Sequence, residues 1–165
     1  MGSAYFFLGN AQKAIRYYEQ ALPILCEIGD KRSEGAALDN LGSAYKNLGD
    51  ACKAIEYHEQ ALAIAREIED RRNEGIWLGC MGNAFYGLND IDNALDYYDQ
   101  QQKIAQEIGD RNGQANAFWG LAICLKQKND TEQAIKKAEN ALSIFEQIES
   151  PSASTMQKLL AEWRR

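Results

Sequence analysis

The chain has 165 residues, 45% of them hydrophobic, and a formal net charge of −6. This composition is ordinary for a folded protein, and a negative charge without any Lys/Arg-rich run argues against nucleic acid and anionic membranes as partners. The sequence has no apolar stretch of about 18 residues, and its first residues lack the pattern of a signal peptide, so we expect neither a membrane span nor a leader.

One sequence unit recurs along the chain with a period of 40 residues. Two columns hold the same residue in every copy: Ala14, Ala54, Ala94 and Ala134 in one, and Ile28, Ile68, Ile108 and Ile148 in the other. A fixed period of this size is typical of stacked supersecondary units that share a core only with their neighbours. The sequence therefore predicts an array over residues 1–149, with units at 1–29, 30–69, 70–109 and 110–149.

The second unit shows how each copy is built. Asp30 and Asp50 are predicted helix caps, because a carboxylate accepts hydrogen bonds from the free amides of a first helical turn. Gly49 can take the left-handed conformation that ends a helix. We therefore predict two helices per unit, here 31–47 and 51–68, each of about 17 residues and joined by tight turns.

Small residues mark the place where the two helices of a unit cross. Gly42 and Gly82 lie on the first helix of the second and third units, and Ala54 and Ala94 lie on the second helix at the same crossing. A larger side chain there would push the helices apart, because overpacking typically costs roughly 1–3 kcal/mol.

Residues 150–165 leave the repeat pattern. Pro151 suits the first turn of a helix. The apolar residues that follow recur at helical spacing on one face: Met156, Leu159, Leu160 and Trp163. We predict a capping helix that covers the last helix of the array through Ile135, Leu142 and Phe145. The alternative, a frayed tail, would leave this apolar face without cover.

The columns of the second unit resemble the signature of the tetratricopeptide repeat, in residues Leu38, Leu41, Gly42, Tyr45, Ala54, His58 and Ala61. The period of 40 residues is similar to that of a long-helix subgroup, which includes kinesin light chains, spindle-orientation adaptors and bacterial signalling arrays. The resemblance implies an all-α fold, a right-handed α-α superhelix (solenoid) of stacked antiparallel helix pairs. It also implies a non-enzymatic scaffold that binds a protein or peptide segment in its concave groove.

In this family the first helix of each unit forms the inner wall of the superhelix. The resemblance therefore implies a peptide-binding groove with these residues: Asn40, Ser43, Lys46, Asn47, Asn83, Tyr86, Asn116, Trp119 and Lys126. The amides can bond to an extended peptide backbone, and Tyr86 and Trp119 can act as aromatic anchors. For Trp119, simple lining of the groove is an equal alternative. The family's carboxylate clamp is not expected, because Asp39 stands where clamping members have lysine.

We predict no catalytic residue, no metal site and no cofactor. His58 is the only histidine, and no column of acids or nucleophiles accompanies it, so it is interpreted as a packing residue. The cysteines show no zinc-ligand spacing, and Cys80 in the groove has no evident activating base. Cys26 and Cys52 fall in surface columns, and unpaired surface thiols suit a reducing cytoplasm.

The front edge of the array favours a second interpretation, self-assembly. Met1 falls in the column of Leu41, so the first helix of the first unit is a stub. Phe6 and Phe7 add aromatic surface to this stub, and exposed apolar patches usually bind partners. Either two such edges form a homodimer, or Phe6 and Phe7 fold back and close the edge within one chain. A structural or self-assembling segment of a larger signalling protein is therefore the alternative to a peptide-binding scaffold.

Overall fold

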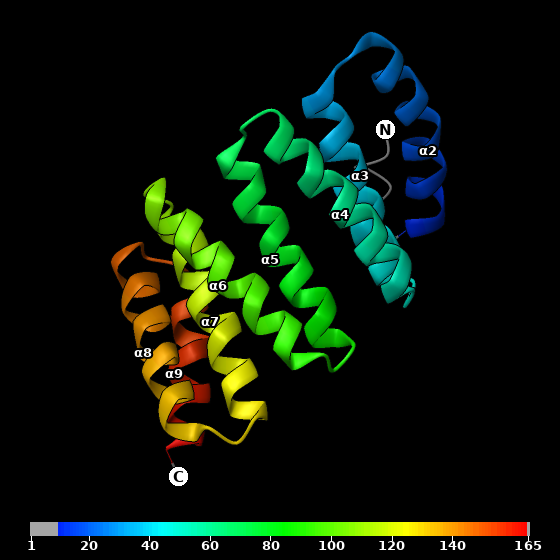
Figure 1. Ribbon diagram of the computed structural model, residues 1–165. Helices are drawn as coiled ribbons and strands as arrows, with labels where there is room; N and C mark the ends of the chain where they lie inside the picture. Colours follow the sequence, from blue (N-terminus) through cyan, green and yellow to red (C-terminus); the bar gives the residue numbers. More distant parts are fainter. Residues whose placement is uncertain (1–9, 165) are drawn as a thin grey trace.

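The computed structural model describes residues 10–164, and this part of the chain is all-helical (Figure 1). It contains eight helices and no strand. None of these eight helices is long and apolar enough to span a membrane. In chain order the helices are α2 (Ala11–Ile28), α3 (Lys31–Asn47), α4 (Ala51–Glu67), α5 (Arg71–Gly87), α6 (Ile91–Glu107), α7 (Arg111–Gln127), α8 (Thr131–Gln147) and α9 (Ser152–Trp163).

Side-chain caps start the helices of the array, as the sequence predicts. The carboxylate of Asp30 accepts a hydrogen bond from the backbone N of Ser33 at 3.1 Å. The predicted helix 31–47 is confirmed as α3, and the predicted helix 51–68 ends one residue earlier, at Glu67. The same cap, an oxygen that accepts from the amide three residues on, occurs at Asn10, Asp50, Asp70, Asp90, Asp110 and Asp130.

Residues with positive φ turn the chain between helices. Gly49 has a φ of 83°, as predicted, and Asn89 takes the same place in the next unit with a φ of 63°. Between units, Gly29 and Gly109 have φ values of 70° and 71°. Glu69 holds the corresponding position with a φ of 54°, without the conformational freedom of glycine.

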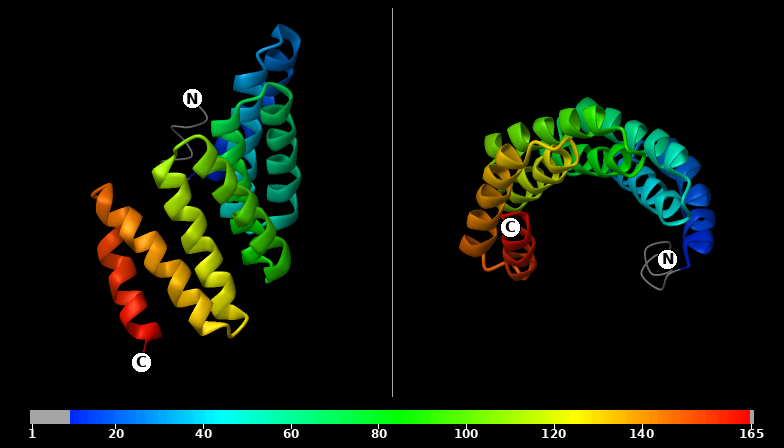
Figure 2. Two further views of the ribbon diagram at one scale, coloured as in Figure 1. Left: turned by 60° about the vertical axis from the view of Figure 1, so that its left-hand side comes forward. Right: turned by 90° about the horizontal axis from the view of Figure 1, so that it is seen from below.

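The helices form two curved rows, one inside the other (Figure 2). Each helix contacts its neighbours in the chain, and α5 also contacts α7. Helices α3, α5, α7 and α9 lie along the inner side of the arc, and α2, α4, α6 and α8 lie along the outer side. The chain is therefore an all-α solenoid whose concave face is made by the first helix of each unit, with α9 continuing the inner row.

The core is a series of clusters at successive helix contacts. Ala54 and Ala94 are fully buried. A Cβ atom on Gly42 would lie 2.9 Å from the carbonyl oxygen of Ala54, so the helices cross closely there, as the sequence predicts. On Gly82 the nearest atom to an added Cβ belongs to the ring of Tyr98, at 2.7 Å, so here a side chain occupies the space that glycine leaves.

Helix α9 packs its apolar face on the end of the array. Met156 is buried in a cluster with Phe145, and Leu142 is packed against that cluster. Leu160 is buried in a second cluster, which Leu142 also joins. Two of the three residues predicted to receive the tail are thus in contact with it, whereas Ile135 belongs to neither cluster.

Two predictions lie outside the described residues. The predicted self-association edge at Phe6 and Phe7 falls within residues 1–9, and the shortened first unit, 1–29, rests on the same segment. Both stay predictions, as do the boundaries of the other units and of the capping segment 150–165.

Candidate functional site

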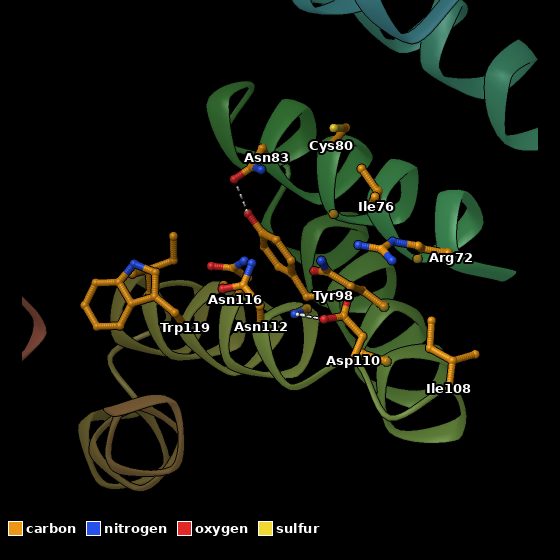
Figure 3. A pocket seen from close by; sticks show the side chains of 17 residues that line it. Arg72, Ile76, Cys80, Asn83, Tyr98, Ile108, Asp110, Asn112, Asn116 and Trp119 are labelled. Carbon is orange, nitrogen blue, oxygen red and sulfur yellow. Dashed lines mark hydrogen bonds between the residues drawn. The ribbon is translucent and has the colours of Figure 1, made fainter. Parts of the chain in front are cut away.

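A hollow of about 600 Å³ opens on the concave face of the arc between α5 and α7 (Figure 3). Helix α5 forms one wall, α7 forms the other, and side chains of α6 form the floor. The lining includes Arg72, Ile76, Cys80 and Asn83 from α5, Tyr98 and Gln101 from α6, and Asn112, Asn116 and Trp119 from α7.

The floor is made by an outer-row side chain that passes between the inner helices. Tyr98 is 3% exposed, and its hydroxyl donates to Oδ1 of Asn83 at 2.9 Å. A Cβ atom on Gly82 or Gly120 would lie 2.7 Å or 2.5 Å from the Tyr98 ring, so glycine at both positions leaves the space that the ring fills. Burial raises the pKa of Tyr98, and its hydroxyl therefore stays a hydrogen-bond donor at neutral pH.

A third glycine opens the other half of the floor. A Cβ atom on Gly79 would lie 2.5 Å from Nε2 of Gln101. The buried amide of Gln101 therefore reaches the hollow beneath Gly79, where it presents both a donor and an acceptor. The hollow is deep because α5 and α7 carry no side chain at Gly79 and Gly120.

Apolar and polar side chains surround this floor. Ile76 and Ile108 are 43% and 39% exposed, although large apolar side chains are usually buried. Asn112 and Asn116 are exposed amides on α7. Within residues 10–164 Arg72 forms no ion pair, so its charge faces the solvent of the concave side. The hollow thus offers apolar contacts, amides and a positive charge to a ligand.

Three of the nine residues predicted for the groove line this hollow: Asn83, Asn116 and Trp119. The ring of Trp119 is half-buried and stacks on that of Trp163 in α9, with centroids 5.4 Å apart and planes inclined by 9°. Trp119 therefore lines the hollow and also holds the last helix in place. The sequence alone could not show this second contact.

The other six predicted residues do not line the hollow: Asn40, Ser43, Lys46, Asn47, Tyr86 and Lys126. Nδ2 of Asn40 donates to the carbonyl of Ala36 in its own helix at 2.8 Å. Nζ of Lys126 donates to Oγ1 of Thr131 at 3.2 Å and lies 5.9 Å from the centroid of the Trp163 ring. A role for these six residues in binding stays a prediction.

The sequence analysis missed the floor of the hollow. Tyr98 and Gln101 belong to the second helix of their unit, which is the outer helix in this architecture. A signal was available in Gly79 and Gly120, because the same columns hold larger side chains in the second unit, Asp39 and Asn40. A glycine on the inner wall indicates that a side chain from the outer row reaches through.

A second polar group joins α3, α4 and α5. The ligand atoms of Asp39, His58 and Cys80 lie within 4.8 Å of one another. His58 is 1% exposed, as expected of a packing residue, but the expectation that no acid accompanies it is wrong, since Nδ1 lies 3.0 Å from Oδ1 of Asp39. Their mutual orientation makes no hydrogen bond, and within the described chain both atoms are buried without a hydrogen-bond partner.

The cysteines differ in their surroundings. Burial, and then the neighbouring Asp39 carboxylate, raise the pKa of Cys80 to about 12. Its thiol is therefore protonated at neutral pH, which agrees with the expectation that Cys80 is not a reactive nucleophile. Cys26 and Cys52 are exposed, as the sequence predicts, and Cys124 is buried.

The comparison with protein families decides what kind of repeat this is. The tetratricopeptide repeat model matches residues 1–67 and 73–147. The chain belongs to the tetratricopeptide repeat family. Tetratricopeptide repeat proteins are generally non-enzymatic scaffolds, and the resemblance seen in the repeat columns is confirmed. No curated protein sequence matches this chain.

Solved structures share the tetratricopeptide repeat fold. Apo RapI superposes with a TM-score of 0.88 at 19% identity, over 98% of this chain and 45% of RapI. A Rap protein in complex with Competence and Sporulation Factor gives a TM-score of 0.82 at 20% identity, over 98% of this chain and 45% of that protein. A putative kinesin light chain from Podosopora anserina gives 0.79 at 20% identity, over 98% of this chain and 81% of that one. This chain thus spans less than half the length of the two Rap proteins.

Proposed function

We propose that this tetratricopeptide repeat chain is a non-enzymatic interaction scaffold that binds an extended peptide or protein segment on its concave face. The observation that carries the proposal is the hollow between α5 and α7, of about 600 Å³. A hollow of this size, with apolar side chains and a few convergent polar groups, is the usual form of a ligand site.

The arrangement of side chains indicates how such a segment would lie. Figure 3 shows Arg72, Ile76 and Ile108 toward one end of the hollow and Trp119 at the other. Ile76 and Ile108 can contact apolar side chains of a ligand, and burial of their exposed area would favour binding. The amide of Asn116, between the two ends, can both donate to and accept from a peptide backbone.

Charge at the hollow favours a carboxylate on the ligand near Arg72. The acidic residue at this end, Asp110, already accepts a hydrogen bond from the backbone N of Gly113 at 2.9 Å as the cap of α7. Arg72 has no such partner in residues 10–164, and guanidinium groups bind carboxylates through paired hydrogen bonds. We therefore expect ligand segments that combine apolar side chains with Asp, Glu or a free C-terminus.

Two further observations support a peptide or protein partner. A Rap protein of the same fold has been crystallised with Competence and Sporulation Factor. The net charge of −6 disfavours nucleic acid and anionic membranes as ligands. Exposed free thiols at Cys26 and Cys52 fit a cytoplasmic location, which is part of the proposal.

The test uses a displayed library of random peptides as the probe. Peptides selected on the whole chain are synthesised, and their Kd values are measured by fluorescence anisotropy. Ile76→Ser and Asn116→Ala should each weaken binding about tenfold, because loss of a central contact typically costs somewhat over 1 kcal/mol. Arg72→Gln should weaken acidic peptides more than neutral ones.

A matched control comes from the end of α8. Ile148 is a similarly exposed isoleucine that does not line the hollow, so Ile148→Ser should leave the Kd unchanged. Equal affinity of the control and of the hollow variants would overturn the proposed site. Failure to select any peptide would favour the structural or self-assembling role instead.

A further inference from the structure

We propose that Asp39, His58 and Cys80 form a binding site for a divalent transition metal, with Zn²⁺ as the preferred ion. The three residues lie on α3, α4 and α5, at the contact between the second and third units. The site is separate from the proposed peptide contacts, although Cys80 also borders the hollow.

The donor set matches this ion. Imidazole nitrogen, thiolate sulfur and carboxylate oxygen are the three protein ligands of Zn²⁺. Their atoms lie within 4.8 Å of one another, and Nδ1 of His58 is 3.0 Å from Oδ1 of Asp39. A tetrahedral ion with bonds of about 2.0–2.3 Å holds its ligands roughly 3.3–3.8 Å apart, so small side-chain rotations bring the group to coordination distance.

Two of the ligand atoms are buried without another partner. Nδ1 of His58 and Oδ1 of Asp39 form no hydrogen bond within the described chain, and His58 is 1% exposed. Buried polar atoms are normally satisfied, and each exception calls for an unrecorded ligand, water or ion. A cation between the two atoms would satisfy both at once.

The surrounding helices hold the donors in place and leave an approach for the ion. A Cβ atom on Gly42 would lie 2.8 Å from Nδ1 of His58, so glycine there makes room for the imidazole. Cys80 borders the open hollow, and Asp39 retains 21% exposure of its side chain. An ion can therefore enter from the concave face, where a fourth position stays open to water or to a donor from a bound segment.

The charges balance with one proton released. Cys80 gives its thiol proton to solvent as the metal–sulfur bond forms, and no group is oxidised or reduced. The Asp39 carboxylate and the Cys80 thiolate then neutralise a divalent ion. Lys46 acts on Cys80 electrostatically from α3 and disfavours a cation, so we expect Lys46→Met to tighten metal binding.

The next contact along the solenoid shows that repeat packing does not require these ligands. The three columns hold Gly79, Tyr98 and Gly120 between the third and fourth units. None of these residues offers an imidazole, a thiolate or a carboxylate. The donor set is therefore particular to one contact, and the chain supplies its own negative control.

The test uses the full chain, freed of metal by a chelator and titrated with Co²⁺. One equivalent per chain should produce a thiolate-to-cobalt charge-transfer band and the intense d–d bands of a four-coordinate ion. Zn²⁺ should then remove these bands, because it binds such sites more tightly than Co²⁺. Cys80→Ser should abolish the charge-transfer band, and Asp39→Asn should weaken binding at least about tenfold.

Controls separate this site from adventitious binding. Cys52 is an exposed thiol far along the chain from the other ligands, so Cys52→Ser should keep the full cobalt spectrum. Circular dichroism and urea unfolding of each metal-free variant check that it is folded. Absence of the band in the wild-type chain, or its survival in Cys80→Ser, would overturn the proposal. Peptide affinity is not a readout here, so the two proposals fail independently.

Discussion

Two neighbouring contacts of the solenoid use the same columns for different chemistry. Between the second and third units, His58 of α4 lies beside Cys80 of the next inner helix. Between the third and fourth units, Tyr98 of α6 lies against Gly120 in the same column. The first contact gathers polar donor atoms, and the second forms the floor of an open hollow.

The difference shows how an unchanged helix arrangement acquires a site. A glycine on the inner wall, such as Gly79 or Gly120, lets a long side chain of the outer row reach the concave surface. A side chain at the same position, such as Asp39 or Cys80, fills that space and leaves room only for the shorter imidazole. Site chemistry is thus decided by side-chain volume on the inner wall, while the backbone stays the same.

The strongest way to break this contrast is to fill the space under the hollow. Gly120→Leu should lower the free energy of unfolding by about 3 kcal/mol, because the added Cβ would lie 2.5 Å from the Tyr98 ring. Urea unfolding followed by circular dichroism measures the change. Gly87→Leu is the control, since no atom lies within 4 Å of an added Cβ there. Equal losses in both variants would show that the Tyr98 contact is not the cause.

A second change makes the first contact resemble the second. His58→Tyr should cost about 2 kcal/mol of unfolding free energy, because the larger ring overlaps Cys80 where Tyr98 meets glycine. Adding Cys80→Gly should restore about 1 kcal/mol, since residues in contact are coupled. The four chains of this double-mutant cycle are compared by urea unfolding, and strictly additive effects would contradict the packing account.

A smaller effect is expected from the hydroxyl on the floor of the hollow. Tyr98→Phe removes the hydrogen bond to Asn83 and should lower the unfolding free energy by about 1 kcal/mol. Tyr97→Phe in the same helix is the control, because within the described chain the Tyr97 hydroxyl makes no hydrogen bond. If thermal unfolding shows the same change for both variants, the Asn83 bond contributes nothing to stability.

The smallest effect concerns the turns that lead into the two contacts. Glu69 has a φ of 54°, whereas Gly109 has the glycine that this conformation favours. Glu69→Gly should raise the free energy of unfolding by about 0.5 kcal/mol, since the gain exceeds the extra freedom of glycine in the unfolded chain. The reverse change, Gly109→Glu, should lower it by about 1 kcal/mol. Changes of the same sign in both variants would exclude backbone strain as the cause.

The sequence by itself determined the repeat, the helices and their turns. Caps such as Asp30 and left-handed residues such as Gly49 act within a few residues along the chain, so their signals are local and readable. Surface columns were equally clear, and the exposed thiols of Cys26 and Cys52 were predicted correctly. The nine predicted groove residues came from the family's inner wall, and Asn83, Asn116 and Trp119 do line the hollow.

Only the tertiary structure decided which side chains meet. Tyr98 reaches the concave face from an outer helix, Trp119 stacks on Trp163, and the ligand atoms of Asp39 and Cys80 gather around a buried histidine. Each meeting joins residues of different helices, and it depends on the spacing and curvature of the stacked units as much as on residue type. A repeat pattern specifies one unit and its neighbour in general terms, but the distances between particular side chains arise from how those units pack in three dimensions.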